Sequence, residues 1–253
     1  MMPCAYEKQS LESHSQGVAK IALAFANDQY IEVCRRRLLR TGVNLEKHTI
    51  RSIILLSALL HDIGKSARYY QKQFDKTCIP VIDHVPSFYL HEISSAAISK
   101  RICDYNNFDT PISFFVVASV LQHLHAIRGI DKDRVINDAI NRFAKNKELL
   151  IFEDHWLKLY EMTNKACLLY GVNTNLNQDL FQNLHVSEIT NLFAWVSKIA
   201  QNRNIRWPKL YILFLNPILV GDNIDAESNR NESQESRNRS PFMRELASTL
   251  GGA

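Results

Sequence analysis

The stretch IRSIILLSALLHDIGK, residues 50–65, joins a long apolar run directly to a His-Asp pair. Ile53 and Ser57 share one helical face with His61, so this imidazole is expected to point into the protein. Asp62 beside it would be costly to bury as an unpaired charge, and a bound cation removes that cost. The stretch therefore predicts a buried helix whose end carries a functional site.

A His-Asp pair alone says little, because it is expected about once in every two chains of this composition. Requiring Gly64 and Lys65 at their positions lowers the expectation to roughly one chain in a thousand. Gly64 is also suited to ending the helix in a left-handed conformation. The five-residue pattern is therefore informative where the dipeptide is not.

Outside this stretch, apolar residues recur mainly at three- and four-residue spacing, and alternating strand-like runs are scarce. With eight glycines in 253 residues, this pattern predicts an all-α fold, a single compact helical bundle. Pro208 and Pro217 each mark a helix start, so two C-terminal helices are expected to meet at a kink. Residues 71–88 are expected to form a loop. The other expected helices span residues 14–27, 30–40, 48–62, 89–104, 111–125, 132–144, 150–170 and 187–203.

Composition favours one soluble domain. Hydrophobic residues make up 46% and charged residues 22% of the chain, which excludes disorder for most of it. Residues 1–226 are expected to form the domain, and residues 227–253 a polar tail or helix extension without apolar periodicity. The net charge of +4 permits a polyanionic partner without requiring one.

The cysteines and the apolar segments indicate the compartment. The cysteines are odd in number, widely spaced and without a C-x-x-C motif, so we expect reduced thiols rather than disulfides or a thiolate zinc site. The first residues lack a secretory apolar stretch, and residues 210–220 are too short for a membrane helix. A cytoplasmic protein with no membrane contact is expected. The cysteines are Cys4, Cys34, Cys78, Cys103 and Cys167.

Further imidazoles and carboxylates fall on inward faces of other expected helices. Each alone has a bland interpretation as a core or capping histidine, or as an exposed acid. Together with the His-Asp pair they form a set of metal ligands supplied by several helices of a bundle. Such a mixture suits Mn, Fe, Ni, Co or Zn, and carboxylate-rich sites also accept Mg. The additional candidates are His14, His91, His123, His125 and Asp222.

These motifs resemble the HD superfamily of metal-dependent phosphohydrolases. Within it, the chain is most similar to the stand-alone HD nuclease of type I CRISPR interference systems, the form detached from its helicase. The resemblance covers residues 14–226. Its motifs are His-Ser-x-x-Val-Ala at 14–19, His-Asp-Ile-Gly-Lys at 61–65, His-Glu-x-x-Ser at 91–95, the histidines at 123–125, and Gly-Asp-Asn-Ile-Asp-Ala at 221–226.

The resemblance implies one or two divalent metal ions per chain, with Mg or Mn favoured and Ni, Co, Fe or Zn as alternatives. It also implies three catalytic side chains: Asp62, which would hold both metals, Lys65 facing the scissile phosphate, and Ser95 lining the site. The implied ligands are His14, His61, Asp62 and Asp222 for one metal, and Asp62, His91 and the pair His123 and His125 for the other.

One departure concerns the second metal. The family usually has adjacent histidines followed by glycine, whereas Leu124 separates His123 from His125 here. On a helix these two side chains point about 200° apart. Both can therefore bind the same metal only if the helix ends or distorts at this point.

The implied reaction is metal-assisted hydrolysis of phosphodiester bonds in nucleic acid, by an endo- or exonuclease acting in antiviral defence. Single-stranded DNA is the favoured substrate, with RNA as an alternative. Two basic clusters are able to follow a phosphate backbone. They are Arg35, Arg36, Arg37 and Arg40, and Arg203, Arg206 and Lys209.

The sequence contains no G-x-x-x-x-G-K-[ST] motif, so a separate CRISPR helicase subunit is expected to open a duplex, together with a surveillance complex. Two alternatives stay open. One is an HD phosphohydrolase that acts on nucleotides. The other is a non-catalytic helical adaptor for a helicase. Metal content and a substrate panel separate the three.

Overall fold

The computed structural model describes residues 2–124 and 132–229, and its core is helical. In these residues, β1 (Cys4–Tyr6) and β2 (Gln9–Ser10) form the only sheet, an antiparallel pair. The expected all-α class is confirmed. The helices are α1 (Leu11–Phe25), α2 (Asp28–Leu39), α3 (Lys47–Leu60), α4 (Arg68–Gln71), α5 (His91–Tyr105), α6 (Thr110–Gln122), α7 (Lys132–Lys145), α8 (Trp156–Tyr170), α9 (Val186–Ala200) and α10 (Ile212–Asn229). Within the described ranges, four 3-10 turns join them, namely η1 (Ile63–Ser66), η2 (Lys147–Leu150), η3 (Gln178–Phe181) and η4 (Trp207–Tyr211).

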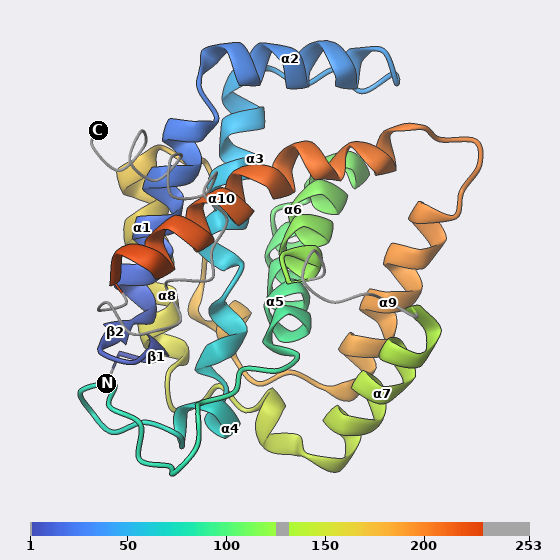
Figure 1. Cartoon of the computed structure of the whole chain (residues 1–253). Coiled ribbons are helices and arrows are strands. Elements are labelled where there is room, and N and C mark those ends of the chain that lie inside the picture. Colours follow the sequence, from blue (N-terminus) through green and yellow to red (C-terminus); the bar gives the residue numbers. More distant parts are fainter. Residues whose placement is uncertain (1, 125–131, 230–253) are drawn as a thin grey trace.

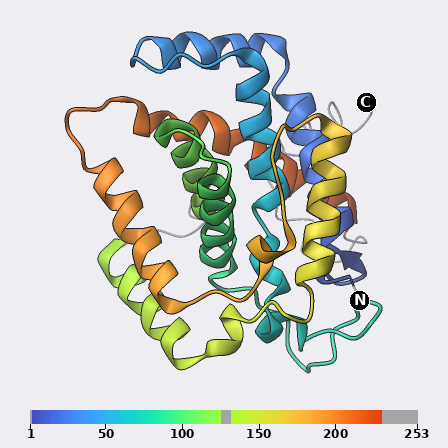
Figure 2. The same cartoon turned by 180° about the vertical axis from the view of Figure 1, so that it is seen from behind.

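Helix α3 is the centre of the bundle. Its residues 53–60 are all buried, as a helix that is apolar on every side requires. Figures 1 and 2 show α1 and α8 on one side of α3, and α5 and α6 on the other. Helix α10 contacts α1, α3 and α6. The C-terminal end of α3 therefore lies where several helices meet.

Local sequence explains where several helices begin. Ser10, Asn27 and Asp109 precede α1, α2 and α6, and each side chain accepts a hydrogen bond from a backbone N–H of the first turn. Such caps satisfy N–H groups that have no partner within the helix. Pro111 follows Asp109 in the first turn of α6, where its missing N–H costs nothing.

The expected helix start at Pro217 is wrong. Pro208 does open η4, but η4 continues into α10, and Pro217 lies inside that helix. Pro217 cannot donate to the carbonyl of Leu213. The hydroxyl of Tyr30 donates to this carbonyl instead, at 2.7 Å. A side chain from α2 therefore supplies the hydrogen bond that the proline removes.

The helix expected from residue 150 begins only at Trp156. The side chain of Asn183 accepts hydrogen bonds from the backbone N–H groups of Phe152, at 2.6 Å, and Glu153, at 3.1 Å. These contacts with a residue about thirty positions away hold the segment before α8 in a non-helical conformation. The expected loop at 71–88 is present, between α4 and α5.

The expectation of reduced cysteines fails at two of the five positions. Cys4 and Cys78 form a disulfide across 74 positions of sequence, which joins β1 to the loop before α5. The backbone N–H of Lys8 also donates to the carbonyl of Cys78 at 2.9 Å. Spacing in the sequence cannot reveal this proximity. The other three cysteines are free and buried.

Helix α10 continues to Asn229, and residues 230–253 lie outside the described residues. The division into a domain at 1–226 and a tail at 227–253 therefore stays a prediction. Among the helices of the described ranges, none combines the length and the apolar character needed to cross a membrane.

Candidate metal centre

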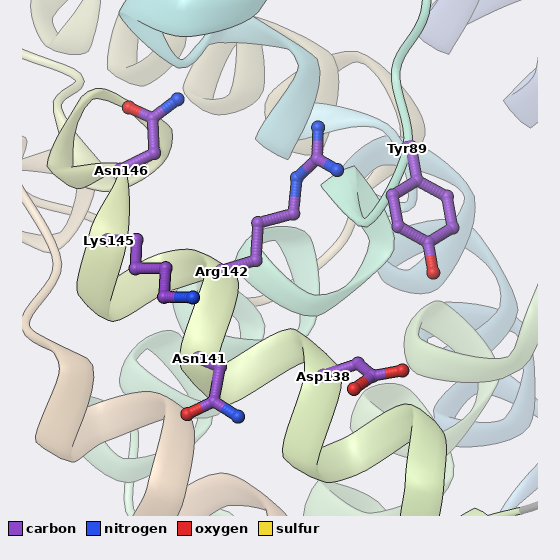
Figure 3. A pocket seen from close by; sticks show the side chains of 6 residues that line it. All are labelled: Tyr89, Asp138, Asn141, Arg142, Lys145 and Asn146. Atoms are coloured by element: carbon purple, nitrogen blue, oxygen red, sulfur yellow. The ribbon is translucent and has the colours of Figure 1, made fainter.

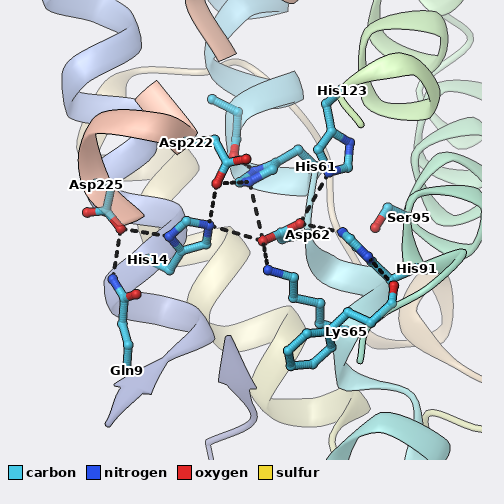
Figure 4. Close-up of polar contacts among 12 residues, drawn as sticks. Gln9, His14, His61, Asp62, Lys65, His91, Ser95, His123, Asp222 and Asp225 are labelled. Atoms are coloured by element: carbon cyan, nitrogen blue, oxygen red, sulfur yellow. Dashed lines mark hydrogen bonds and ion pairs between the residues drawn. The ribbon is translucent and has the colours of Figure 1, made fainter. Parts of the chain in front are cut away.

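Two groups of potential metal ligands meet at Asp62 (Figure 4). In the first group, the Nε2 atom of His14 lies 3.0 Å from Asp62 Oδ2 and 3.3 Å from Asp222 Oδ1. The Nε2 atom of His61 lies 3.4 Å and 3.9 Å from the same two oxygens. Two imidazoles and two carboxylates thus face one point.

The second group uses the other oxygen of the same carboxylate. Oδ1 of Asp62 lies 2.6 Å from His91 Nε2 and 3.3 Å from His123 Nε2. The side chains of Asp62, His91 and His123 are at most 3% exposed. Asp62 is therefore the side chain that both groups share, and it has one oxygen on each.

Separate elements bring these side chains together. His14 lies on α1 and Asp222 on α10. His61 is the C-cap of α3, and Asp62 is the N-cap of η1. His91 and His123 lie at the N-terminal end of α5 and the C-terminal end of α6. The bundle thus gathers the candidates that the sequence places on different helices, with the exception of His125, which lies outside the described residues.

Three of the imidazoles are oriented by backbone carbonyls three residues earlier in the chain. The Nδ1 atom of His61 lies 2.8 Å from Ala58 O, and that of His123 lies 2.7 Å from Val120 O. His91 Nδ1 makes the equivalent contact with the carbonyl of residue 88, at 2.6 Å. A carbonyl can only accept, so each Nδ1 carries a proton and each Nε2 faces Asp62. In the neutral ring, this is the tautomer that binds a metal through Nε2.

His14 is oriented by a side chain instead. Its Nδ1 donates to Asp225 Oδ2 at 2.7 Å, and Gln9 Nε2 donates to the same oxygen at 2.8 Å. The sequence predictions missed both partners. Asp225 lies one helical turn after Asp222, so the 3.6-residue period could have revealed it. No pattern in the sequence points to Gln9.

The polar atoms in the centre fit divalent cations. In the described residues, five buried atoms that face this point have no hydrogen-bond partner, although Asp62 Oδ2 forms an ion pair with Lys65 Nζ. Buried polar atoms are normally paired, and imidazole nitrogens with carboxylate oxygens are the donors that divalent transition metals prefer. The residues present therefore suit one or two such ions. The five atoms are Nε2 of His14, His61 and His123, Oδ2 of Asp62 and Oδ1 of Asp222.

The two carboxylates are held in the charged form. Burial alone would raise the pKa of Asp62, but the nearby His61 and Lys65 outweigh burial and hold that pKa well below its usual range. Burial also opposes ionisation of Asp222, and its contacts with His14 and His61 again keep the pKa low. Both carboxylates are therefore charged near neutral pH, as metal ligands must be.

Burial and the charged carboxylates also shift the pKa values of the imidazoles. Burial lowers the pKa of His91, which favours the neutral ring that binds a metal. Burial would also lower the pKa values of His14 and His123, but neighbouring carboxylates raise both. Negative charge therefore dominates around these two rings, a condition that a bound cation relieves.

Lys65 lies deeper than the sequence suggests. Its Nζ is 2.5 Å from Asp62 Oδ2, and the side chain is only 2% exposed. The ammonium also lies 3.8 Å from the centre of the Tyr6 ring and 4.9 Å from that of Phe88. Burial opposes its charge, but Asp62 outweighs burial and raises the pKa of Lys65. Lys65 is thus a charged partner of Asp62.

Ser95 supports the turn that contains the His-Asp pair. Its buried hydroxyl accepts a hydrogen bond from the backbone N–H of Gly64 at 2.8 Å. The expected left-handed Gly64 is wrong, because this residue is absent from the positive-φ residues of the described chain. A Cβ at Gly64 would instead lie 2.1 Å from the carbonyl oxygen of His91. Glycine is therefore needed for the close approach of η1 to α5.

For His123 and His125 to bind the same metal, helix α6 has to end or distort near them. The helix ends at Gln122, so His123 lies in the turn that follows it. Of the two, the structure describes His123 alone, and it faces Asp62.

Comparison with known proteins identifies the family. Residues 5–161 of the 253-residue chain match the family described as Cas3, HD domain. The chain belongs to the Cas3 HD-domain family. It is also similar to the CRISPR-associated endonuclease Cas3-HD of Saccharolobus solfataricus, with 33% identity over 99% of this chain and 97% of that protein.

The fold agrees with this assignment. The CRISPR-associated Cas3 HD domain protein from Methanocaldococcus jannaschii superposes with a TM-score of 0.57 at 16% identity. The match covers 87% of this chain and 98% of that one. The resemblance drawn from the motifs is confirmed, and the Cas3 HD-domain chain is a CRISPR-associated HD nuclease.

Proposed function

We propose that this HD nuclease hydrolyses phosphodiester bonds of nucleic acid in CRISPR interference, with single-stranded DNA as the favoured substrate and RNA as the alternative. The observation that carries the proposal is the sharing of Asp62 by two imidazole-rich groups. A carboxylate with one oxygen on each of two adjacent sites is suited to a pair of metal ions acting on one phosphate. A purely structural metal site would need only one of these groups.

Each group would hold one divalent metal ion, Mg or Mn in the first instance, with Ni, Co, Fe or Zn also compatible with the donors. Such ions, when bound, polarise a phosphate and lower the pKa of a coordinated water. The first set is His14, His61, Asp62 and Asp222, and the second is Asp62, His91 and His123.

Two further side chains would support the reaction through these ligands. Lys65 holds Oδ2 of Asp62 and brings a positive charge to the side where a phosphate would bind. Ser95 fixes the backbone of Gly64, two residues after Asp62. We therefore assign both residues to positioning of the shared carboxylate.

The expected partners follow from the proposed nuclease function. A separate CRISPR helicase subunit and a surveillance complex would deliver the single strand. Of the two basic clusters, the one on α2 gives weaker support, because Arg35 and Arg36 both bind Glu32. Helix α2 also lies beside the N-terminal end of α3 (Figure 1), whereas the metal centre follows the C-terminal end. Residues 203–209 lead into η4, which contacts α2, so position does not favour this cluster over the first.

The test is a cleavage assay with Mn²⁺ or Mg²⁺ on labelled single-stranded DNA, duplex DNA, RNA and a panel of nucleotides. Purified protein should cut single-stranded nucleic acid, and Asp62→Asn should abolish cutting because it weakens both groups of ligands. Asp104→Asn is the matched control, since this carboxylate is 61% exposed and pairs with Lys100 on α5. The proposal fails if Asp62→Asn still cuts, or if only nucleotides are hydrolysed.

A further inference from the structure

A pocket of about 550 Å³ lies between α7 and the segment that leads into α5 (Figure 3). None of the metal-centre residues lines it. The lining contains one aromatic ring, two amides and three charged groups, which come from Tyr89, Asp138, Asn141, Arg142, Lys145 and Asn146.

Cation–π contacts are already formed at this pocket. The guanidinium carbon of Arg142 lies 5.2 Å from the centre of the Tyr89 ring and 5.9 Å from that of the Tyr69 ring. Arg142 also donates to the Tyr69 hydroxyl at 3.5 Å. Tyr89 keeps 38% of its surface exposed, so part of the tyrosine remains accessible. A planar guanidinium beside an aromatic ring is a common platform for stacking a nucleobase.

The pocket and the metal centre are adjacent in the chain. Tyr89 lies two residues before His91, and its carbonyl accepts a hydrogen bond from the Tyr70 hydroxyl at 2.6 Å. Leu90, between them, has the left-handed φ of 75°, a conformation that costs energy in residues other than glycine. This turn sets Tyr89 in the pocket lining while His91 faces Asp62. Strain of this kind is typical of functional sites.

The remaining lining groups match the other parts of a nucleotide. The side-chain amides of Asn141 and Asn146 and the carboxylate of Asp138 have the donors and acceptors that read base edges. The ammonium of Lys145 suits a phosphate. This concentration of polar groups does not suit a small apolar ligand.

We propose that this pocket binds an unpaired base of the nucleic-acid strand whose phosphodiester lies at the metal centre. The inference rests on the proposed nuclease function and adds a basis for choosing single strands. A base in a duplex would first have to leave its stack and its partner in order to enter the pocket. An unpaired base meets no such cost.

The test compares Tyr89→Leu with the wild-type protein on two single-stranded oligonucleotides of equal length, one normal and one abasic. Cleavage is measured with Mn²⁺, and binding is measured by fluorescence anisotropy with Ca²⁺. We expect KM and Kd of the normal strand to rise about tenfold in the variant, because one stacking contact is lost. The abasic strand should bind the two proteins equally, which a merely structural role of Tyr89 would not produce.

Tyr105→Leu is the matched control, because Tyr105 ends α5, the helix that begins two residues after Tyr89, and is 50% exposed. Arg142→Gln should reproduce the effect of Tyr89→Leu, and it replaces that variant if circular dichroism shows that Tyr89→Leu is unfolded. Equal binding of the normal strand by wild type, Tyr105→Leu and the pocket variants would overturn the inference.

Hydrolysis of bis(p-nitrophenyl) phosphate, which has no base, separates this failure from failure of the nuclease proposal. If the pocket variants hydrolyse it at the wild-type rate but also bind normal strands unchanged, the pocket inference is wrong and the metal centre stands. If the wild-type protein hydrolyses neither this ester nor any oligonucleotide, the nuclease proposal fails instead, and the Ca²⁺ binding data still decide on the pocket.

Discussion

The Nδ1 atom of His14 donates to Asp225 at 2.7 Å, and the carboxylate that accepts it also holds Gln9 at 2.8 Å. A carboxylate behind an imidazole fixes the ring and makes its other nitrogen a stronger ligand. Helix α1 leaves room for this carboxylate at Gly17, where a Cβ would lie 1.8 Å from an oxygen of Asp225. Asp225 thus acts on the metal centre through His14.

We predict that Asp225→Asn weakens Mn²⁺ binding about ten- to a hundredfold, since it removes the charge that supports His14. Isothermal titration calorimetry measures the affinity. Asp104→Asn, an exposed change on α5, should leave it unaltered. Unchanged affinity in Asp225→Asn would show that the contact only packs α1 against α10.

Metal stoichiometry tests the two groups separately. His123→Gln should lower the bound metal from about two ions per chain to about one, because it removes a ligand from the second group only. Asp62→Asn should reduce both sites, since each group uses one of its oxygens. Metal analysis after dialysis gives the number. A single ion in the wild-type protein that survives His123→Gln would contradict the two-site arrangement.

Much of the metal centre is predictable from the sequence because its ligands follow helical periodicity. His61 and His14 were expected on inward faces, and both are fully buried. The supporting residues obey no such rule. Gln9 and Tyr6 belong to a short hairpin whose position depends on contacts with residues about 60 or more positions away, such as the hydrogen bonds between Cys4 and Gln71.

The wrong predictions of helix boundaries have the same physical origin. Pro217 reads as a helix start, yet the Tyr30 hydroxyl satisfies the carbonyl that this proline leaves without a donor. Asn183 similarly keeps residues 152 and 153 out of α8. In both places a single side chain, distant in sequence, overrides the local preference. Periodicity within one helix contains no information about such a partner.

Replacement of Lys65 should destabilise the protein in a metal-dependent way. In EDTA, Lys65→Met is expected to lower the free energy of unfolding by about 3–5 kcal/mol, because it leaves the buried Asp62 charge without its partner. Saturating Mn²⁺ should reduce this loss, since a cation offsets the same charge. Urea denaturation in both buffers measures the difference. Lys72→Met removes an exposed pair with Glu148 and should cost less than about 1 kcal/mol in either buffer.

Equal losses for Lys65→Met in EDTA and in Mn²⁺ would mean that the ammonium stabilises the fold independently of the metal centre. Its contact with the Tyr6 ring, at 3.8 Å, would then be one contribution, beside its ion pair with Asp62. Tyr6→Leu should in that case lower the free energy of unfolding by the amount that a cation–π contact supplies, about 1–2 kcal/mol.

The disulfide should stabilise the hairpin that supports the centre. Cys4 and Cys78 are 74 positions apart, and closing a loop of this length restricts the unfolded chain by about 4 kcal/mol in the entropic account. Dithiothreitol should therefore lower the denaturation midpoint of the wild-type protein, but leave the double variant Cys4→Ser, Cys78→Ser unchanged. The free Cys34, Cys103 and Cys167 are present in both proteins, so any effect of the reductant on them would appear in both. Mass spectrometry after denaturation and alkylation without reductant should show three modified cysteines in the wild type, and five would exclude the bond.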